Sequence, residues 1–248
     1  MKQTSKKLLL WLYPIAELQH RRRVDYQQIQ LILPELTEDG RQSLIRLLES
    51  KELLFTDRLS TQLSLSISTY GKSLLEAQFP VLTQPADTTT KQWGLILFMQ
   101  APNTDKNFRY LRNFLLADHC LALTRGTYLC VGKPGDSLLS LLEKSYRGAV
   151  LIVQFDNLLF GDELKIIGLK FGIESLVKSY SDIGKDIDSL LTKKINYKSL
   201  SDQQKRSIYS VYDRLFNNLE LDHNLINRYF PQEKSGIFLL NQLKSLLP

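Results

Sequence analysis

The side chains that could perform catalysis or bind a metal are few and scattered along the chain. The three histidines, His20, His119 and His223, fall in three different predicted elements, and no cysteine or histidine pair has the spacing of metal ligands. Neither a glycine-rich phosphate loop nor a G-x-S-x-G elbow occurs in the sequence. We therefore expect no catalytic residues, no metal and no cofactor, and we expect that the protein is not an enzyme.

The two cysteines, Cys120 and Cys130, give no disulfide framework, because such frameworks need more cysteines in a small secreted chain. We expect both to be buried core residues rather than ligands. The same argument makes a cytoplasmic setting the default. The longest apolar runs, LLLWLY and GAVLIV, are much shorter than a bilayer-spanning helix, so no membrane partner is expected.

Residues 37–51 offer a different chemistry, which is hydrogen bonding to a long polar ligand. Apolar residues at helical spacing predict the buried side of a helix: Leu44, Leu47 and Leu48. Another side of this helix is entirely polar: Asp39, Gln42, Ser43, Arg46 and Ser50. Arginine and glutamine side chains form paired hydrogen bonds with base edges in the major groove of DNA. We therefore predict that Gln42, Ser43 and Arg46 read bases.

The elements around this helix must hold it in place. Thr37 can cap its start, and Glu38 and Asp39 suit the positive end of the helix dipole. A short apolar run at 53–55, a polar turn at 57–60 and alternation from Leu63 to Ile67 then predict a hairpin. A helix followed by a hairpin is the second half of a winged helix-turn-helix. A helix and hairpin in any small α+β core is the competing interpretation.

The upstream residues fit the winged-helix order. A helix is predicted over 5–13, capped by Ser5 and ended or kinked at Pro14, and a second over 26–32, capped by Asp25. A further helix over 72–78 closes the segment. In this arrangement the helix ends, the hairpin and the basic cluster near residue 22 would contact phosphates. The residues predicted to contact the DNA backbone are Arg21, Arg22, Arg23, Arg41, Lys51, Arg58 and Thr61.

The remaining chain divides into a linker at 81–92, a domain at 93–160 and a helical domain at 161–248. Strands are predicted at 93–99, 121–123, 127–131 and 149–155, and helices at 107–116 and 137–146. This βαββαβ order is typical of a ferredoxin-like domain. The fold class is thus α+β, with an N-terminal winged helix-turn-helix at 1–80, a central ferredoxin-like dimerisation domain and a C-terminal helical domain. The net charge of +6 is spread along the chain, so it permits a nucleic-acid partner without proving one.

Short motifs resemble the PaaX family of bacterial transcriptional repressors over nearly the full length. They occur in the family's order: Arg41–Leu48, Leu65–Lys72, Trp93, Arg109–Leu115, Gly126–Tyr128, Phe171–Ile173 and Asp222–Leu225, then Phe230 and Pro231. The resemblance implies a homodimer that binds double-stranded DNA at a partly palindromic operator, and an acyl-coenzyme A type of effector that releases it. Asp118-His119-Cys120 stands where the family usually has a glycine turn, so no effector-binding residues are carried over.

Two other functions remain open at this stage. The middle domain also resembles the small CRISPR adaptation nuclease subunit, so a nucleic-acid-processing protein that uses Asp118 or Asp156 is the alternative. The first strand ends Met99-Gln100-Ala101, however, where that subunit needs an aspartate. A winged helix that binds another protein and no DNA is the third candidate.

Overall fold

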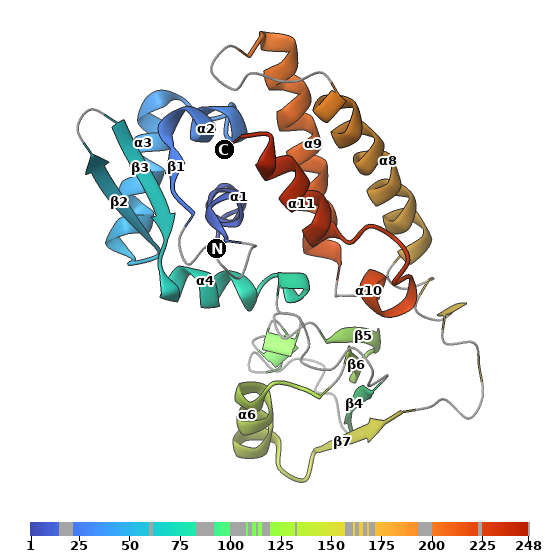
Figure 1. The fold of residues 1–248 in the computed structure, drawn as a ribbon. Coiled ribbons are helices and arrows are strands. Elements are labelled where there is room, and N and C mark those ends of the chain that lie inside the picture. The colour runs from blue at the N-terminus through green and yellow to red at the C-terminus, as the bar shows by residue number, and fades with distance from the viewer. Residues whose placement is uncertain are drawn as a thin grey trace. The chain divides into compact units, whose positions relative to one another are not determined.

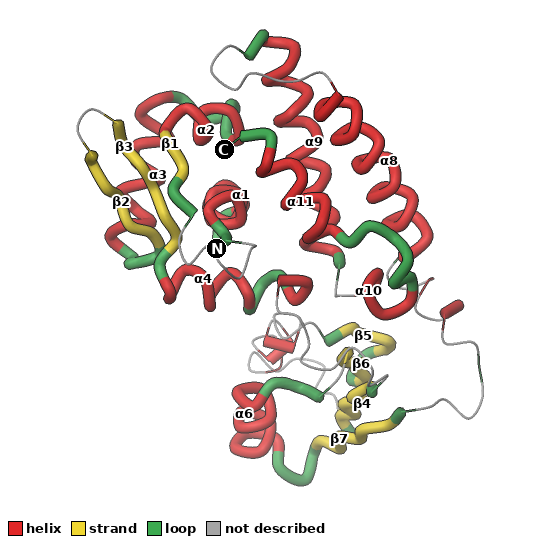
Figure 2. Tube along the Cα trace, in the orientation of Figure 1, coloured by secondary structure: helices red, strands yellow, loops and turns green. Residues whose placement is uncertain are grey.

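The structure is a computed structural model. It describes residues 1–14, 22–59, 62–82, 92–99, 108, 111–112, 114–115, 120–131, 133–156, 161, 164–165, 168, 172–192, 200–222 and 225–247. Helices and two antiparallel sheets combine in an α+β fold, as predicted (Figures 1 and 2). The chain forms two compact units. The first contains Met1–Leu82, Ser175–Asp222 and Pro231–Pro248, and the second contains Thr83–Glu174 and His223–Phe230.

In its described residues, the N-terminal part of the first unit forms four α-helices and a three-stranded sheet. Its elements are α1 (Gln3–Leu12), β1 (Val24–Asp25), α2 (Tyr26–Ile32), α3 (Glu38–Ser50), β2 (Leu54–Leu59), β3 (Gln62–Ile67), α4 (Thr69–Glu76) and the short 3-10 helix Pro80–Leu82. The strands pair antiparallel in the order β1-β3-β2. β1 is only two residues long, yet it adds a third strand beside the hairpin.

Local side-chain caps set where these helices begin. The Asp25 carboxylate accepts a hydrogen bond from the Gln28 backbone N–H at 2.9 Å, and the Thr37 hydroxyl accepts one from Gly40 at 3.2 Å. Both predicted caps are thus confirmed. The predicted cap at Ser5 is wrong, because α1 starts earlier, at Gln3, and Ser5 is buried within it.

The β2–β3 hairpin is longer than the sequence suggested. Its pairing runs from Leu54 opposite Ile67 to Leu59 opposite Gln62, so Asp57 and Arg58 lie in β2. The prediction of a polar turn at 57–60 is therefore wrong for its first three residues. Strand pairing is made by backbone groups, so polar side chains on an exposed strand do not interrupt it.

The C-terminal helices share a core with the N-terminal helices of the same unit. They are α8 (Ile173–Thr192), α9 (Asp202–Leu221) and α11 (Gly236–Ser245). The ring of Tyr212 in α9 meets the edge of Trp11 in α1, with centroids 4.9 Å apart, and Phe216 packs on Phe79 in the same way at 5.7 Å. On α11, the Lys244 ammonium donates to the carbonyls of Leu10 and Tyr13 at 2.8 and 2.7 Å.

The second unit is built on a four-stranded antiparallel sheet. Its elements are β4 (Trp93–Phe98), β5 (Leu121–Thr124), β6 (Thr127–Val131), α6 (Asp136–Tyr146), β7 (Val150–Phe155) and α10 (Leu225–Tyr229). The strand order is β5-β6-β4-β7. The predicted hairpin at Arg125-Gly126 is confirmed, and Gly126 adopts the left-handed φ of 85° that its turn requires. Leu111 and Leu115 are buried against the sheet, as predicted.

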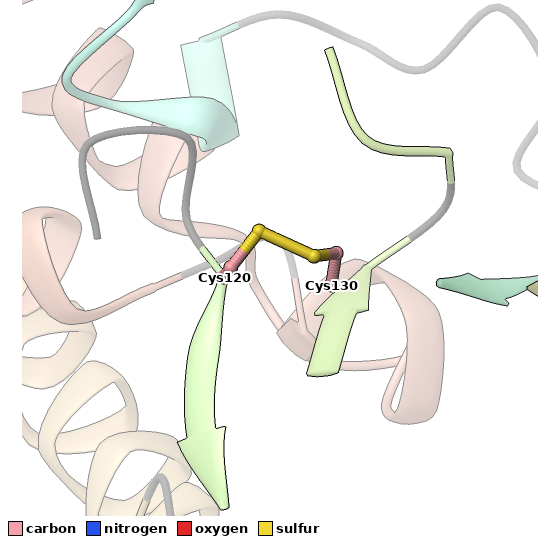
Figure 3. The surroundings of a disulfide bond; sticks show 2 residues. All are labelled: Cys120 and Cys130. Atoms are coloured by element: carbon pink, nitrogen blue, oxygen red, sulfur yellow. A yellow bond between two sulfur atoms is a disulfide. The ribbon is translucent and has the colours of Figure 1, made fainter. Parts of the chain in front are cut away.

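Cys120 and Cys130 are joined by a disulfide (Figure 3). Both are buried in the core of the second unit, as predicted, but the expectation of no disulfide is wrong. Leu121 pairs with Leu129, so the neighbouring Cys120 and Cys130 also lie opposite each other, with Cα atoms 4.3 Å apart. Within the described ranges, no helix has the length and apolar character needed to cross a membrane.

Candidate nucleic-acid interface

One side of α3 is exposed and mostly polar. Gln42, Ser43 and Arg46 are all exposed, while Leu44 and Leu48 are buried beneath them, as predicted. Leu47 departs from the prediction, because 43% of it is exposed and Ile45 is buried instead. Leu47 lies one turn from both Ser43 and Ser50, so it belongs to the exposed side of the helix. The three predicted base-reading residues therefore share an open helix face, with one leucine at its border.

A carboxylate organises the first turn of this face. The Glu38 Oε1 atom accepts a hydrogen bond from the Gln42 amide nitrogen at 3.3 Å. Its Oε2 atom accepts from the Gln30 amide on α2 and from the Arg41 guanidinium, each at 3.3 Å. The neighbouring Tyr26 hydroxyl is the largest cause of a lowered pKa for Glu38, which keeps the carboxylate ionised. Glu38 thus links α2 to α3 and holds Gln42.

A cleft of about 400 Å³ lies beside α3, between the start of α2 and the hairpin. Its lining residues are Asp25, Tyr26, Gln27, Glu38, Gln42, Ile45, Arg46, Glu49, Thr56 and Leu63. Among the described residues of this lining, Arg46 is the cation, and Asp25, Glu38 and Glu49 are acidic. These carboxylates would repel the phosphates of DNA. An anionic partner at this cleft would therefore have to bind through Arg46.

Two predicted phosphate contacts are used inside the protein instead. The Arg22 guanidinium is half-buried over the Trp11 ring, 5.1 Å from its centroid, and donates to the Leu247 carbonyl at 3.2 Å. Burial lowers the pKa of Arg22 to about 10. The Arg41 side chain is only 12% exposed and donates to the carbonyls of Leu33, at 3.2 Å, and Leu36. We therefore remove Arg22 and Arg41 from the predicted set.

Of the other predicted phosphate contacts, two are exposed on the surface and three have side chains outside the described part of the chain. Arg23 is 63% exposed and lies 3.7 Å from Asp57 on the hairpin, and Lys51 is exposed at the end of α3. Arg58 lies in β2, but its side chain is outside the described part of the chain, as are Arg21 and Thr61 entirely. Arg23, near the hairpin, and Lys51, at the end of α3, thus remain as exposed basic residues.

Sequence reasoning missed the role of Glu38. Its position after a Thr cap indicates only a favourable interaction with the helix dipole. Its hydrogen bond with Gln42 has the ordinary four-residue spacing of a helix, but its contact with Gln30 depends on how α2 packs against α3. A pattern of polar residues alone could not reveal that packing.

Comparisons with known proteins bear on the fold. No family model matches the chain, and no curated protein matches it. Among solved structures, the fold is similar to uncharacterized protein Rv0674 from Mycobacterium tuberculosis, with a TM-score of 0.52 and 13% sequence identity. The alignment covers 96% of this chain and 92% of that chain. At this identity the likeness concerns the fold alone.

Proposed function

We propose that the protein is a DNA-binding transcriptional regulator, a repressor, whose α3 enters the major groove. The observation that carries the proposal is the exposed polar face of α3, with Gln42, Ser43 and Arg46, beside the β2–β3 hairpin. The element order, with β1 pairing to the hairpin, supports the assignment of a winged helix-turn-helix. In this proposal Arg46 and Gln42 read base edges, while Arg23, Lys51 and Arg58 contact phosphates.

The second unit supports a ferredoxin-like assignment, and we assign it the role of dimerisation domain. Its strand order and antiparallel pairing are those of a split βαβ arrangement. A dimer with two-fold symmetry would match a palindromic operator, as the resemblance to PaaX repressors implies. An acyl-coenzyme A type of effector belongs to the same proposal.

The strand β7 is the surface that we assign to the dimer contact. It lies at the edge of the sheet formed by the described residues, and it contains no charged residue. Leu151, Ile152 and Val153 are 49%, 36% and 38% exposed. If two copies pair antiparallel through β7, Arg147 lies near Asp156 of the partner subunit, because the start of one strand meets the end of the other. A second copy therefore suits this edge in both hydrophobicity and charge.

Sedimentation of purified protein tests the dimer contact. Wild type should sediment as a dimer at micromolar concentration, and Leu151→Lys should sediment as a monomer, because each copy would bring a lysine charge into the apolar strand pair. Leu221→Lys is the matched control, since Leu221 is 60% exposed at the end of α9. A monomeric wild type, or a dimer that survives Leu151→Lys, would exclude β7 as the contact.

Selection of bound duplexes from a random pool tests the DNA-binding proposal. On the selected site, Arg46→Ala should cost about 1–3 kcal/mol and relax the sequence preference. Arg58→Ala should weaken binding to all duplexes and reduce the dependence on salt concentration. Failure of the wild type to retain any duplex at low salt would refute the proposal. Uniform loss from Arg46→Ala would show that another surface reads the bases.

A further inference from the structure

The orientation of the Gln42 side-chain amide is set by its neighbour Glu38. An ionised carboxylate only accepts hydrogen bonds, so it can hold the NH₂ end of a glutamine amide and not its oxygen. The Gln42 amide nitrogen lies 3.3 Å from Glu38 Oε1. The other carboxylate oxygen, Oε2, is held by Gln30 from α2 and by Arg41, which anchors Glu38 itself. An amide flip at Gln42 would place its oxygen against a carboxylate, so the geometry excludes it.

This orientation leaves Gln42 with a particular pair of free groups. One N–H is occupied by Glu38, and the second N–H and the Oε1 atom remain for a ligand. In the major groove, adenine presents an acceptor at N7 beside a donor at N6, which complements one N–H and one carbonyl oxygen. Guanine presents two acceptors, N7 and O6, and its O6 would face the Gln42 oxygen. The bound amide is therefore suited to adenine and opposed to guanine.

We propose that Glu38 is a positioning residue that makes Gln42 select adenine at one position of the DNA site. This inference rests on the proposed function, and it adds a base preference and the residue that enforces it. Glu38 does not need to touch DNA for this role, because it acts by holding one end of the Gln42 amide. Its contacts to α2 mean that the preference depends on the packing of α2 against α3.

The test compares Glu38→Ala and Glu38→Gln with Asp39→Asn, which removes one negative charge from the same exposed helix turn. Fluorescence anisotropy measures binding to the selected duplex, to the variants with each base pair at every position, and to a scrambled duplex. The wild type should prefer adenine over guanine at one position by about tenfold or more. In both Glu38 variants this ratio should fall to about threefold or less, while affinity for the scrambled duplex stays equal or rises. Asp39→Asn should keep the ratio.

A double-mutant cycle connects the preference to Gln42. Gln42→Ala should abolish the preference, and Glu38→Ala combined with Gln42→Ala should lose nothing more, because Glu38 acts through Gln42. An unchanged adenine ratio in the Glu38 variants, or additive losses in the double variant, would overturn this inference and leave DNA binding intact. A wild type that binds DNA without any adenine position would also overturn it. Absence of binding to every duplex would instead overturn the proposed function, and this inference with it. Urea midpoints of the variants confirm that each is folded.

Discussion

Tyr212 offers a test of whether the C-terminal helices share a core with the start of the chain. Its side chain is fully buried in α9, and its hydroxyl donates to the Lys7 carbonyl of α1 at 2.5 Å. Tyr212→Phe removes this hydrogen bond and preserves the edge contact with Trp11. Because the ring stays, the change in stability reports the hydroxyl and its partner alone.

The expected loss at neutral pH is about 1 kcal/mol. A buried carbonyl left without any partner would cost about 1–3 kcal/mol. Lys7 lies inside α1, so its carbonyl also accepts the hydrogen bond from the backbone four residues later, and only its second lone pair is vacated. The loss should therefore match the net value of an ordinary hydrogen bond, which is about 0.5–1.5 kcal/mol.

The pH dependence of stability gives a second test, which is the pH at which wild type and Tyr212→Phe are equally stable. Burial raises the pKa of the Tyr212 hydroxyl well above 10, so the folded protein keeps this proton while the unfolded chain releases it near about pH 10. The stability from this group is thus complete below about pH 10 and is lost as the pH rises above it. At about pH 11 the wild type has lost about 1.4 kcal/mol that Tyr212→Phe keeps. The two stability curves should cross between about pH 10.5 and 11.

The assay is urea unfolding followed by fluorescence in a Trp93→Phe background. Trp11 and Trp93 are the only tryptophans, and they lie in different units, so this background reports the first unit alone. Tyr70→Phe is the control, because Tyr70 is 60% exposed and its substitution should leave the midpoint at neutral pH unchanged. If Tyr212→Phe equals wild type at neutral pH and shows no crossing, α9 does not pack against α1 as described.

Three further predictions concern residues of the same unit. Arg22→Ala should lower stability by about 1–2 kcal/mol, because it removes a cation–π contact and a charge-assisted hydrogen bond, while the neighbouring Arg23→Ala should leave stability unchanged. Gly71→Ala should cost about 3 kcal/mol or more, since its Cβ would lie 2.0 Å from the Leu53 carbonyl oxygen. Burial, and next the charge of Arg22, lower the pKa of Lys244 well below 10.5, so wild type should gain stability relative to Lys244→Met as the pH rises toward 10.5.

Urea midpoints check all three predictions, and each has an internal comparison. Equal stability of Arg22→Ala and Arg23→Ala, with equal loss of DNA affinity, would return Arg22 to the phosphate contacts. Gly184→Ala is the comparison for Gly71→Ala. It should be neutral or stabilising, because the nearest atom to its added Cβ lies 3.5 Å away, at van der Waals distance. Lys234→Met is the control for Lys244→Met, because it removes a lysine that is exposed on the surface.

The sequence by itself determined the local features of this protein. The caps at Asp25 and Thr37 and the hairpin at Arg125-Gly126 were predicted at the observed positions. Each depends on groups within a few residues of one another, so a short stretch of sequence contains the whole interaction. For the same reason, the polar residues Gln42, Ser43 and Arg46 could be placed on one exposed helix face before the structure was known.

Only the tertiary structure decided which side chains are free to act. Arg22 looked like a surface residue in a basic cluster, but two of its acceptors lie 222 and 225 residues further along the chain. Cys120 directly precedes β5 and Cys130 lies in β6. The two cysteines meet because these strands pair in one particular register. The Glu38 carboxylate that holds Gln42 is itself held by Gln30 only because α2 packs against α3. These contacts join residues that no local pattern relates, so packing and strand register had to be known before their roles could be assigned.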